Sequence, residues 1–167
     1  MPPRKPANSP VTISVFDRLI DQDPKVRAEA PPTRLQSMRD LKAALRRDLE
    51  WLLNTRQQID PLPEGAAELP RSVFTYGLPD ITSLGISSLE DRRKLTRIME
   101  TALANFEPRL ANPKVKFVPS GEGKTHILRF VIEGFLRVDP APEYVTFDTV
   151  LETVIGAYEV KGEAGAR

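Results

Sequence analysis

Cysteine is absent from the 167 residues of this chain, and histidine occurs once, as His126. The missing cysteine excludes disulfide bonds and thiolate metal sites. Because the chain also shows no signal-peptide pattern, we expect a reducing, cytoplasmic setting. One histidine builds neither a typical zinc site nor a triad with a thiol nucleophile, so we expect no metal and no cofactor. We interpret His126 as a surface residue at the start of a strand.

Long apolar runs and an excess of one charge are also missing. No apolar run approaches the roughly 20 residues that a membrane-spanning helix needs, so we expect no integral membrane segment. Lysine and arginine number 24 against 23 acidic residues, a net charge of +1, which gives no global field toward nucleic acid or membrane. A basic run at residues 39–47 is interrupted by acidic residues, which indicates a solvated face rather than a nucleic-acid surface.

Signatures of catalysis are sparse. The glycine-lysine stretch at residues 121–124 lies between two expected strands and lacks the strand-to-helix context of a phosphate loop. A glycoside hydrolase needs two carboxyl groups about 5 to 9.5 Å apart beside a cleft, and the available candidates are Glu107, Glu133, Asp148 and Glu152. None of them stands in a sequence context that marks a general acid. We therefore expect no catalytic residue.

The two ends of the chain differ from its middle. Residues 1–33 are rich in proline and polar side chains, and we expect a flexible tail that carries one short helix. This helix starts at Ser14, which pairs with Asp17 as a cap, and its apolar face consists of Val15, Phe16, Leu19 and Ile20. Residues 161–167 are expected to be a disordered tail, which leaves 34–160 as the folded domain.

The first long helix is predicted over residues 34–54, with Asn54 as its C-terminal cap. Its apolar stripe consists of Leu35, Met38, Leu41, Leu45, Leu49, Leu52 and Leu53. Trp51 projects from the opposite side, beside Arg47. Two interpretations remain open: the short N-terminal helix folds over Trp51, or Trp51 and Arg47 form an intermolecular hot spot.

Beyond the first helix, the residues Tyr76, Gly77, Pro79 and Asp80 read as a turn. A second helix should open at Ser87, which has capping-box spacing to Glu90. Its stripe consists of Leu95, Ile98, Met99, Ala102, Leu103 and Phe106. The apolar period then changes from 3.6 to 2, which predicts strands over 114–118, 128–138 and 144–151. We therefore predict an α+β fold, with an antiparallel sheet of three to four strands packed against two main helices.

The tripeptide Glu107-Pro108-Arg109 follows the second helix directly. Proline pushes the residue before it into an extended conformation, so we expect Glu107 and Arg109 to project side by side from an edge strand. The pair is either an internal salt bridge that closes the corner or a device that grips a partner. The residues alone leave these two interpretations open.

Three separated motifs give the chain a resemblance. They are the run Arg46-Arg47-Asp48-Leu49-Glu50-Trp51-Leu52-Leu53-Asn54-Thr55-Arg56, then Ser72 with Tyr76-Gly77-Leu78-Pro79-Asp80, and then Glu107-Pro108-Arg109-Leu110. In order and spacing they resemble the baseplate wedge proteins of contractile injection machines. This is the phage tail wedge lysozyme-like family with its type VI secretion branch, TssE. The resemblance covers about residues 34–155, and the first motif points to the secretion branch.

The resemblance implies a structural subunit that docks in the baseplate wedge and helps to start polymerisation of the contractile sheath. The implied partners are other wedge subunits and the sheath protein, at a baseplate on the cytoplasmic side of a bacterial inner membrane. It assigns partner contacts to Glu107, Pro108 and Arg109, and we add Trp51 and Arg47. A strand edge at 107–118 would accept a sheath strand. The family name also implies a cell-wall hydrolase, which we keep as the alternative function.

Overall fold

The computed structural model describes residues 9–20, 32–57, 65, 67–80, 88–119 and 127–163. Along the chain its elements are α1 (Val15–Leu19), α2 (Arg34–Asn54), η1 (Leu69–Arg71), η2 (Val73–Thr75), α3 (Leu89–Phe106), β1 (Leu110–Val118), β2 (Ile127–Leu136), β3 (Glu143–Glu152) and β4 (Ala157–Glu163). Within these residues, no helix is both long and apolar enough to cross a membrane. The bounds of α2 and the short helix α1 confirm the predicted elements.

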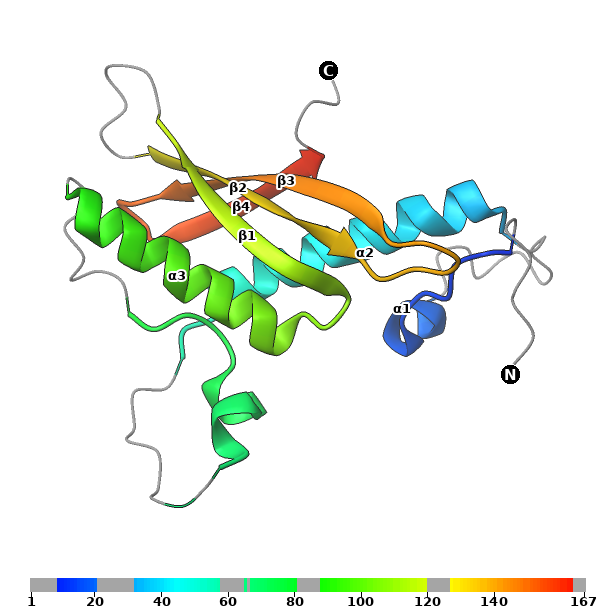
Figure 1. The fold of residues 1–167 in the computed structure, drawn as a ribbon, viewed down its shortest axis with the longest axis horizontal. Helices are drawn as coiled ribbons and strands as arrows, with labels where there is room; N and C mark the ends of the chain where they lie inside the picture. The colour runs from blue at the N-terminus through cyan, green and yellow to red at the C-terminus, as the bar shows by residue number, and fades with distance from the viewer. Residues whose placement is uncertain are drawn as a thin grey trace.

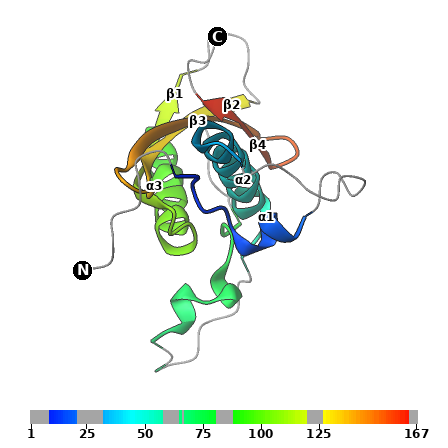
Figure 2. The ribbon, with the colours of Figure 1, turned by 90° about the vertical axis from the view of Figure 1, so that its right-hand side faces the viewer.

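The molecule has two layers (Figure 1). The four strands pair antiparallel in the order β1-β2-β3-β4. Seen end-on, α2 and α3 lie side by side against one face of this sheet, and α1 lies beside α2 (Figure 2). The predicted α+β fold is therefore confirmed, and the fourth strand is β4.

The core fills the space between the helices and the sheet. The inner face of β2 is apolar at every second position, as the alternation predicts. The largest fully buried side chains are Phe130, Phe147, Leu45, Leu49, Leu52, Met99, Leu103, Ile132, Leu136, Leu151, Val145 and Val160. Leu35 was expected in this core but is 63% exposed, because it lies in the first turn of α2, before the helix passes under the sheet.

Side chains fix the helix ends. Thr33 caps α2 in a reciprocal capping box with Gln36. The cap of α3 is Ser88, whose hydroxyl accepts from the backbone N–H groups of Glu90 and Asp91, so the prediction of Ser87 was off by one residue. Ser87 itself lies outside the described residues, as do His126, residues 120–125 and the linker at 21–31.

The outer margin of β4 is occupied by side chains of α2. The amide of Asn54 donates to the Tyr158 carbonyl and accepts from its N–H, both at 2.8 Å. Glu50 accepts from the N–H of Val160 at 3.1 Å. Asn54 was expected to cap α2, but Thr55 does so instead, and Asn54 completes the hydrogen bonds of the sheet. β4 itself runs to Glu163, beyond the expected start of the C-terminal tail at 161.

The margin at β1 is less open than the sequence suggested. The N–H of Val115 donates to the Glu100 carboxylate of α3 at 2.9 Å, instead of pointing free. Two residues earlier stands Pro113, which has no N–H to offer. The strand has β2 on one side, and along the described residues no strand pairs with its other side. β1 is thus an edge strand, but the N–H of Val115 is already bonded and Pro113 has no N–H, so fewer donors are open to another strand.

The N-terminal residues from Ser9 onward lie against the domain. The N–H of Val11 donates to the hydroxyl of Ser37 at 2.9 Å, and the guanidinium of Arg34 donates to the carbonyl of Ser9 at 3.2 Å. Val11 and Ile13 pack on the core. This segment holds α1 beside α2, so the part of the tail from residue 9 to residue 20 is placed by specific contacts.

Candidate functional site

Glu107 and Arg109 lie in the turn between α3 and β1. Glu107 caps α3, its N–H donating to the Leu103 carbonyl at 2.9 Å, and β1 begins only at Leu110. The prediction that the pair projects outward from a strand is therefore wrong, because the helix ends and the turn begins at these residues. Glu107 is 5% exposed, and its carboxylate accepts from Nε of Arg109 at 2.7 Å and from Nη2.

This pair belongs to a chain of five charges that crosses three elements. Nη2 of Arg109 donates to Asp48 of α2 at 2.7 Å. Arg47 then joins Asp48 to Asp17 of α1, with an oxygen of each carboxylate 2.8 Å from its guanidinium. Three carboxylates face two guanidinium groups, so this network of five side chains has a net charge of −1. It ties α1, α2 and the turn after α3 together.

The charges stabilise one another's ionised forms. Hydrogen bonds to Glu107 raise the pKa of Arg109 above its ordinary value, against the opposing effect of burial. Hydrogen bonds to Asp48 raise the pKa of Arg47 in the same way. Burial works to raise the pKa of Asp17, but hydrogen bonds from Ser14 and Arg47 outweigh it and lower that pKa. We therefore infer that the cluster acts mainly as an internal brace.

The predicted turn motif folds back on the end of α2. Gly77 has a φ of 108°, and a Cβ at this position would stand 2.3 Å from the Thr55 carbonyl oxygen. The close approach allows the N–H of Leu78 to donate to that carbonyl at 2.8 Å. Gln57 then donates from its N–H to the carbonyl of Leu78 at 2.7 Å. Only glycine fits here without strain.

Tyr76 connects the turn motif to the end of α3. Its ring meets the Phe106 ring edge-on, with 5.3 Å between centroids. Burial, followed by the nearby charges of Asp48 and Glu107, raises the pKa of Tyr76. The two other residues of the motif point elsewhere: Pro79 lines a separate groove and Asp80 is exposed.

The three sequence motifs meet at one open groove of about 350 Å³, which we call the motif groove. It is lined by Ser14, Asp48, Leu52, Tyr76, Phe106, Glu107, Pro108 and Arg109. Asp48 was named as part of the first sequence motif, but no contact was predicted for it. A signal was present, because Asp48 follows Leu45 by three residues and precedes Leu52 by four, at the border of the apolar stripe.

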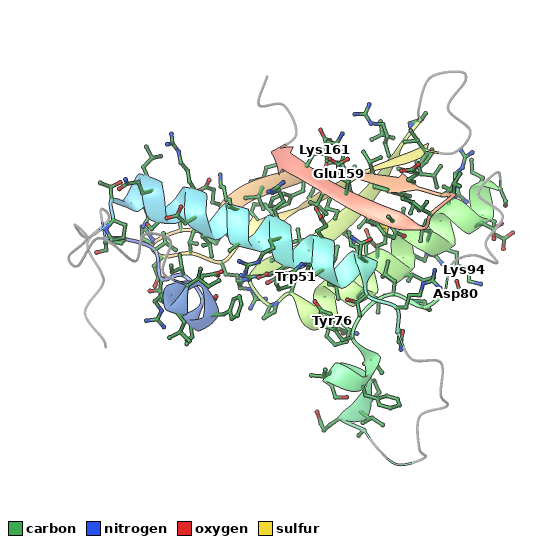
Figure 3. All side chains as sticks on the ribbon, turned by 180° about the vertical axis from the view of Figure 1, so that it is seen from behind. Trp51, Tyr76, Asp80, Lys94, Glu159 and Lys161 are labelled. Carbon is green, nitrogen blue, oxygen red and sulfur yellow. The ribbon has the colours of Figure 1, made fainter. Side chains whose placement is uncertain are left out.

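Trp51 and Arg47 lie beside this groove. The guanidinium of Arg47 sits over the Trp51 ring at 5.2 Å and over the Phe16 ring at 5.6 Å. Trp51 nevertheless stays 55% exposed and Phe16 56% exposed. The short helix α1 thus shares the guanidinium of Arg47 with Trp51 and leaves Trp51 more than half exposed. Trp51 and Tyr76 both lie below α2 in Figure 3, on the side away from the sheet.

Of the acids considered for hydrolysis, Glu107 lies apart from Glu133, Asp148 and Glu152, which share the outer face of β2 and β3. Glu133 is on the outer face of β2, where it binds Lys116 at 2.7 Å. Glu107 shares the motif groove with one other described carboxylate, that of Asp48, and both bind the same guanidinium. Within the described residues no group of three or more acidic or histidine side chains is arranged to hold a metal ion. Glu107 and Asp48 are therefore arranged as members of a salt-bridge network.

A family model provides the comparison with known proteins. The model described as "Baseplate wedge protein gp25" matches residues 39–141. This range includes α2 from its second turn, the turn motif, α3, β1 and β2, and hence every lining residue of the motif groove except Ser14. No curated protein and no solved structure matches the chain significantly.

Proposed function

This chain belongs to the baseplate wedge protein gp25 family, and we propose on that premise that it is a type VI secretion member of the family, docking to wedge subunits and helping to start sheath polymerisation. Membership gives the chain a structural role in a phage-like baseplate. The finer assignment to the secretion branch rests on the run Arg46 to Arg56. The protein would then act at the assembled baseplate, on the cytoplasmic side of the inner membrane.

The observation that carries the proposal is the convergence of three distant motifs on the motif groove. Packing alone explains Gly77, Leu52 and Tyr76. It does not explain why a tryptophan and a proline remain exposed at the rim, next to a rigid network of charges. Exposed aromatic side chains next to arginine are the composition of interaction hot spots. We therefore place the wedge contact on Trp51, Arg47 and Pro108.

Glu107 and Arg109 have a different role in this proposal. They shape the floor of the groove and hold α3, α2 and α1 in register, while quarter-exposed Arg109 offers the partner a limited polar contact. Reversing either charge does not isolate a docking defect. Arg109→Glu, for example, would bring a third carboxylate against Asp48 and Glu107 and destabilise the fold itself.

The sheath contact at β1 requires a local change. A strand added along this margin must displace Glu100 from the N–H of Val115, and it gains no bond from Pro113. We propose that sheath pairing uses the C-terminal half of β1, where Phe117 is the next residue of the same orientation after Val115.

The experiment replaces the chromosomal gene with a Trp51→Ala variant in cells whose sheath protein is fluorescently tagged. The matched control is Leu35→Ala on the same helix, because Leu35 is also more than half exposed but lies far from the motif groove. Trp51→Ala should melt normally yet yield few sheaths and co-purify fewer wedge subunits, while Leu35→Ala should behave as the wild type. Normal sheath counts with Trp51→Ala would contradict the docking assignment. The purified chain should also release no fragments from cell wall, and clear turnover would contradict the structural role.

A further inference from the structure

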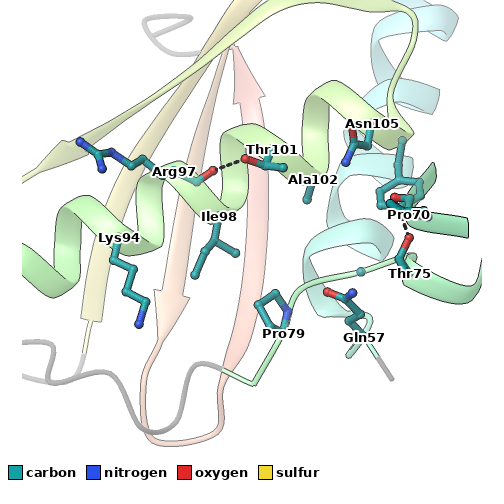
Figure 4. A pocket seen from close by; sticks show the side chains of 12 residues that line it. Gln57, Pro70, Thr75, Pro79, Lys94, Arg97, Ile98, Thr101, Ala102 and Asn105 are labelled. Carbon is teal, nitrogen blue, oxygen red and sulfur yellow. Dashed lines mark hydrogen bonds between the residues drawn. The ribbon is translucent and has the colours of Figure 1, made fainter. Parts of the chain in front are cut away.

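A second groove lies on the other side of the wall formed by Tyr76 and Phe106. It occupies about 380 Å³ between α3 and the segment 70–79, and Phe106 is the only described lining residue that it shares with the motif groove. Figure 4 shows Ile98 on α3 facing Pro79 and Gln57 across it. None of the five charges of the salt-bridge network lines it, so neither this network nor the proposed wedge contact accounts for the second groove.

The floor of the second groove is apolar. Ile98, Ala102 and Phe106 line it from α3, and Pro70 and Pro79 line it from the opposite segment. Ile98 and Phe106 are only partly buried although they pack on the core. The floor therefore offers apolar surface that an aliphatic side chain of another chain can cover, with a gain of about 25 cal/mol per Å² removed from water.

The rim of the second groove carries two cations. Lys94 and Arg97 of α3 are exposed and line the groove, whereas no carboxylate does so among the described residues. Within the same part of the chain, neither cation forms an ion pair. In Figure 4 the Lys94 side chain extends from the same side of α3 as Ile98. The rim thus favours a negatively charged occupant.

Two side-chain amides in the groove can bind the main chain of a peptide. The side chains of Gln57 and Asn105 line the groove, and neither amide has a hydrogen-bond partner in the described portion of the structure. Each presents a donor and an acceptor. An extended peptide exposes unpaired N–H and C=O groups, so it can bind both amides at once.

From these observations we propose that the second groove binds an acidic, apolar segment of a partner protein in an extended conformation. An aliphatic side chain covers Ile98 and Ala102, a neighbouring carboxylate pairs with Lys94, and the peptide main chain bonds with Gln57 and Asn105. This partner surface is separate from the motif groove and does not depend on the proposed wedge contact. Nucleic acid fits less well, because its bases and phosphates would meet an apolar floor with cations on one side only.

The first step of the test identifies the occupant. A photoreactive phenylalanine derivative replaces Thr101, which is exposed in the groove, in the full chain expressed in its own cells. After illumination, mass spectrometry gives the sequence of the cross-linked peptide. The proposal expects a segment of another protein with an aspartate or glutamate next to an aliphatic residue. A cross-link only to residues 81–87 of the same chain, a segment without acids, or no captured protein would each overturn it.

The second step measures the charge contact. The captured segment is made as a fluorescent peptide, and its affinity is compared between Lys94→Glu and Arg93→Glu. Arg93 is exposed on the same helix but does not line the groove, so the two variants change net charge equally. Lys94→Glu should weaken binding about tenfold or more, the effect of losing one charge-assisted hydrogen bond. Equal weakening by both variants would refute the proposed pairing. Trp51→Ala should leave peptide binding unchanged, which separates this test from that of the wedge contact.

Discussion

Glu107→Gln tests whether the ion pair in the turn between α3 and β1 is a structural brace. The substitution keeps the size of the side chain and removes its charge. The buried Glu107 carboxylate accepts three hydrogen bonds from Arg109: from the backbone N at 3.2 Å, from Nε at 2.7 Å and from Nη2. A glutamine presents one oxygen and one NH₂, so one of the two guanidinium donors meets another donor.

The expected loss of stability in Glu107→Gln follows from the burial of the Glu107 carboxylate. Removing one partner of a fully buried ion pair costs about 3–5 kcal/mol, and one hydrogen bond to a charged group contributes about 1.5–3 kcal/mol. The Arg109 side chain is 25% exposed and keeps its bond to Asp48 at 2.7 Å, which places the loss at the lower end. We expect the free energy of unfolding to fall by about 2–3 kcal/mol, a drop in Tm of about 5–10 °C for a domain of this size.

The assay is urea unfolding followed by the fluorescence of Trp51, the single tryptophan of the chain. The matched control is Glu143→Gln, because Glu143 also pairs with a cation, Lys42 at 2.6 Å, but its side chain is 40% exposed. An exposed pair contributes about 0–1 kcal/mol. If both glutamine variants lose the same small amount of stability, the interpretation of the turn as a brace is refuted.

Three further predictions concern the turn motif, the sheet margin and α1. Gly77→Ala should destabilise the chain by more than about 2 kcal/mol in thermal or urea unfolding, whereas Gly65→Ala should cost about 1 kcal/mol, because both glycines have positive φ but only the Cβ at position 77 strikes backbone. Equal costs would show that the contact with Thr55 relaxes freely. Asn54→Ala should expose the margin of β4 and increase self-association in analytical ultracentrifugation, and a monomer at all concentrations would contradict that role of Asn54. The lowered pKa of Asp17 means that its carboxylate stabilises the docking of α1 above its unfolded pKa of about 3.9, and that this stabilisation is lost as pH falls through the lower folded value. The emission of Trp51 should therefore change in this acid window and not in Asp17→Asn, and an identical acid transition in both proteins would exclude Asp17 as its origin.

Local periodicity predicts the elements that have one continuous apolar face. The stripe from Met38 to Leu53 defines α2, and the alternation from Leu128 to Leu136 defines β2, because each pattern repeats the geometry of its own element. β4 gives a weaker signal, since only Tyr158 and Val160 alternate toward the core over its short length. The sequence analysis therefore left the number of strands at three to four.

The candidate site depends on contacts between distant residues, which local sequence patterns do not predict. Asp48 and Arg109 are 61 residues apart, and nothing in either segment indicates that they meet. Glu100 at Val115 and Asn54 at Tyr158 are likewise contacts between elements, created by the packing of helices on a sheet. Asn54 was assigned to a helix cap because asparagine suits that position locally. The tertiary structure gives it a different partner.

The most direct test of the docking claim is hydroxyl-radical footprinting of Trp51 in the isolated chain and in purified, assembled baseplates. In the isolated chain the ring is 55% exposed and should oxidise readily. Strong protection of Trp51 in the assembled baseplate is the result that our account predicts. Equal oxidation of Trp51 in both states would contradict it, because the rim of the motif groove would then face solvent in the working machine.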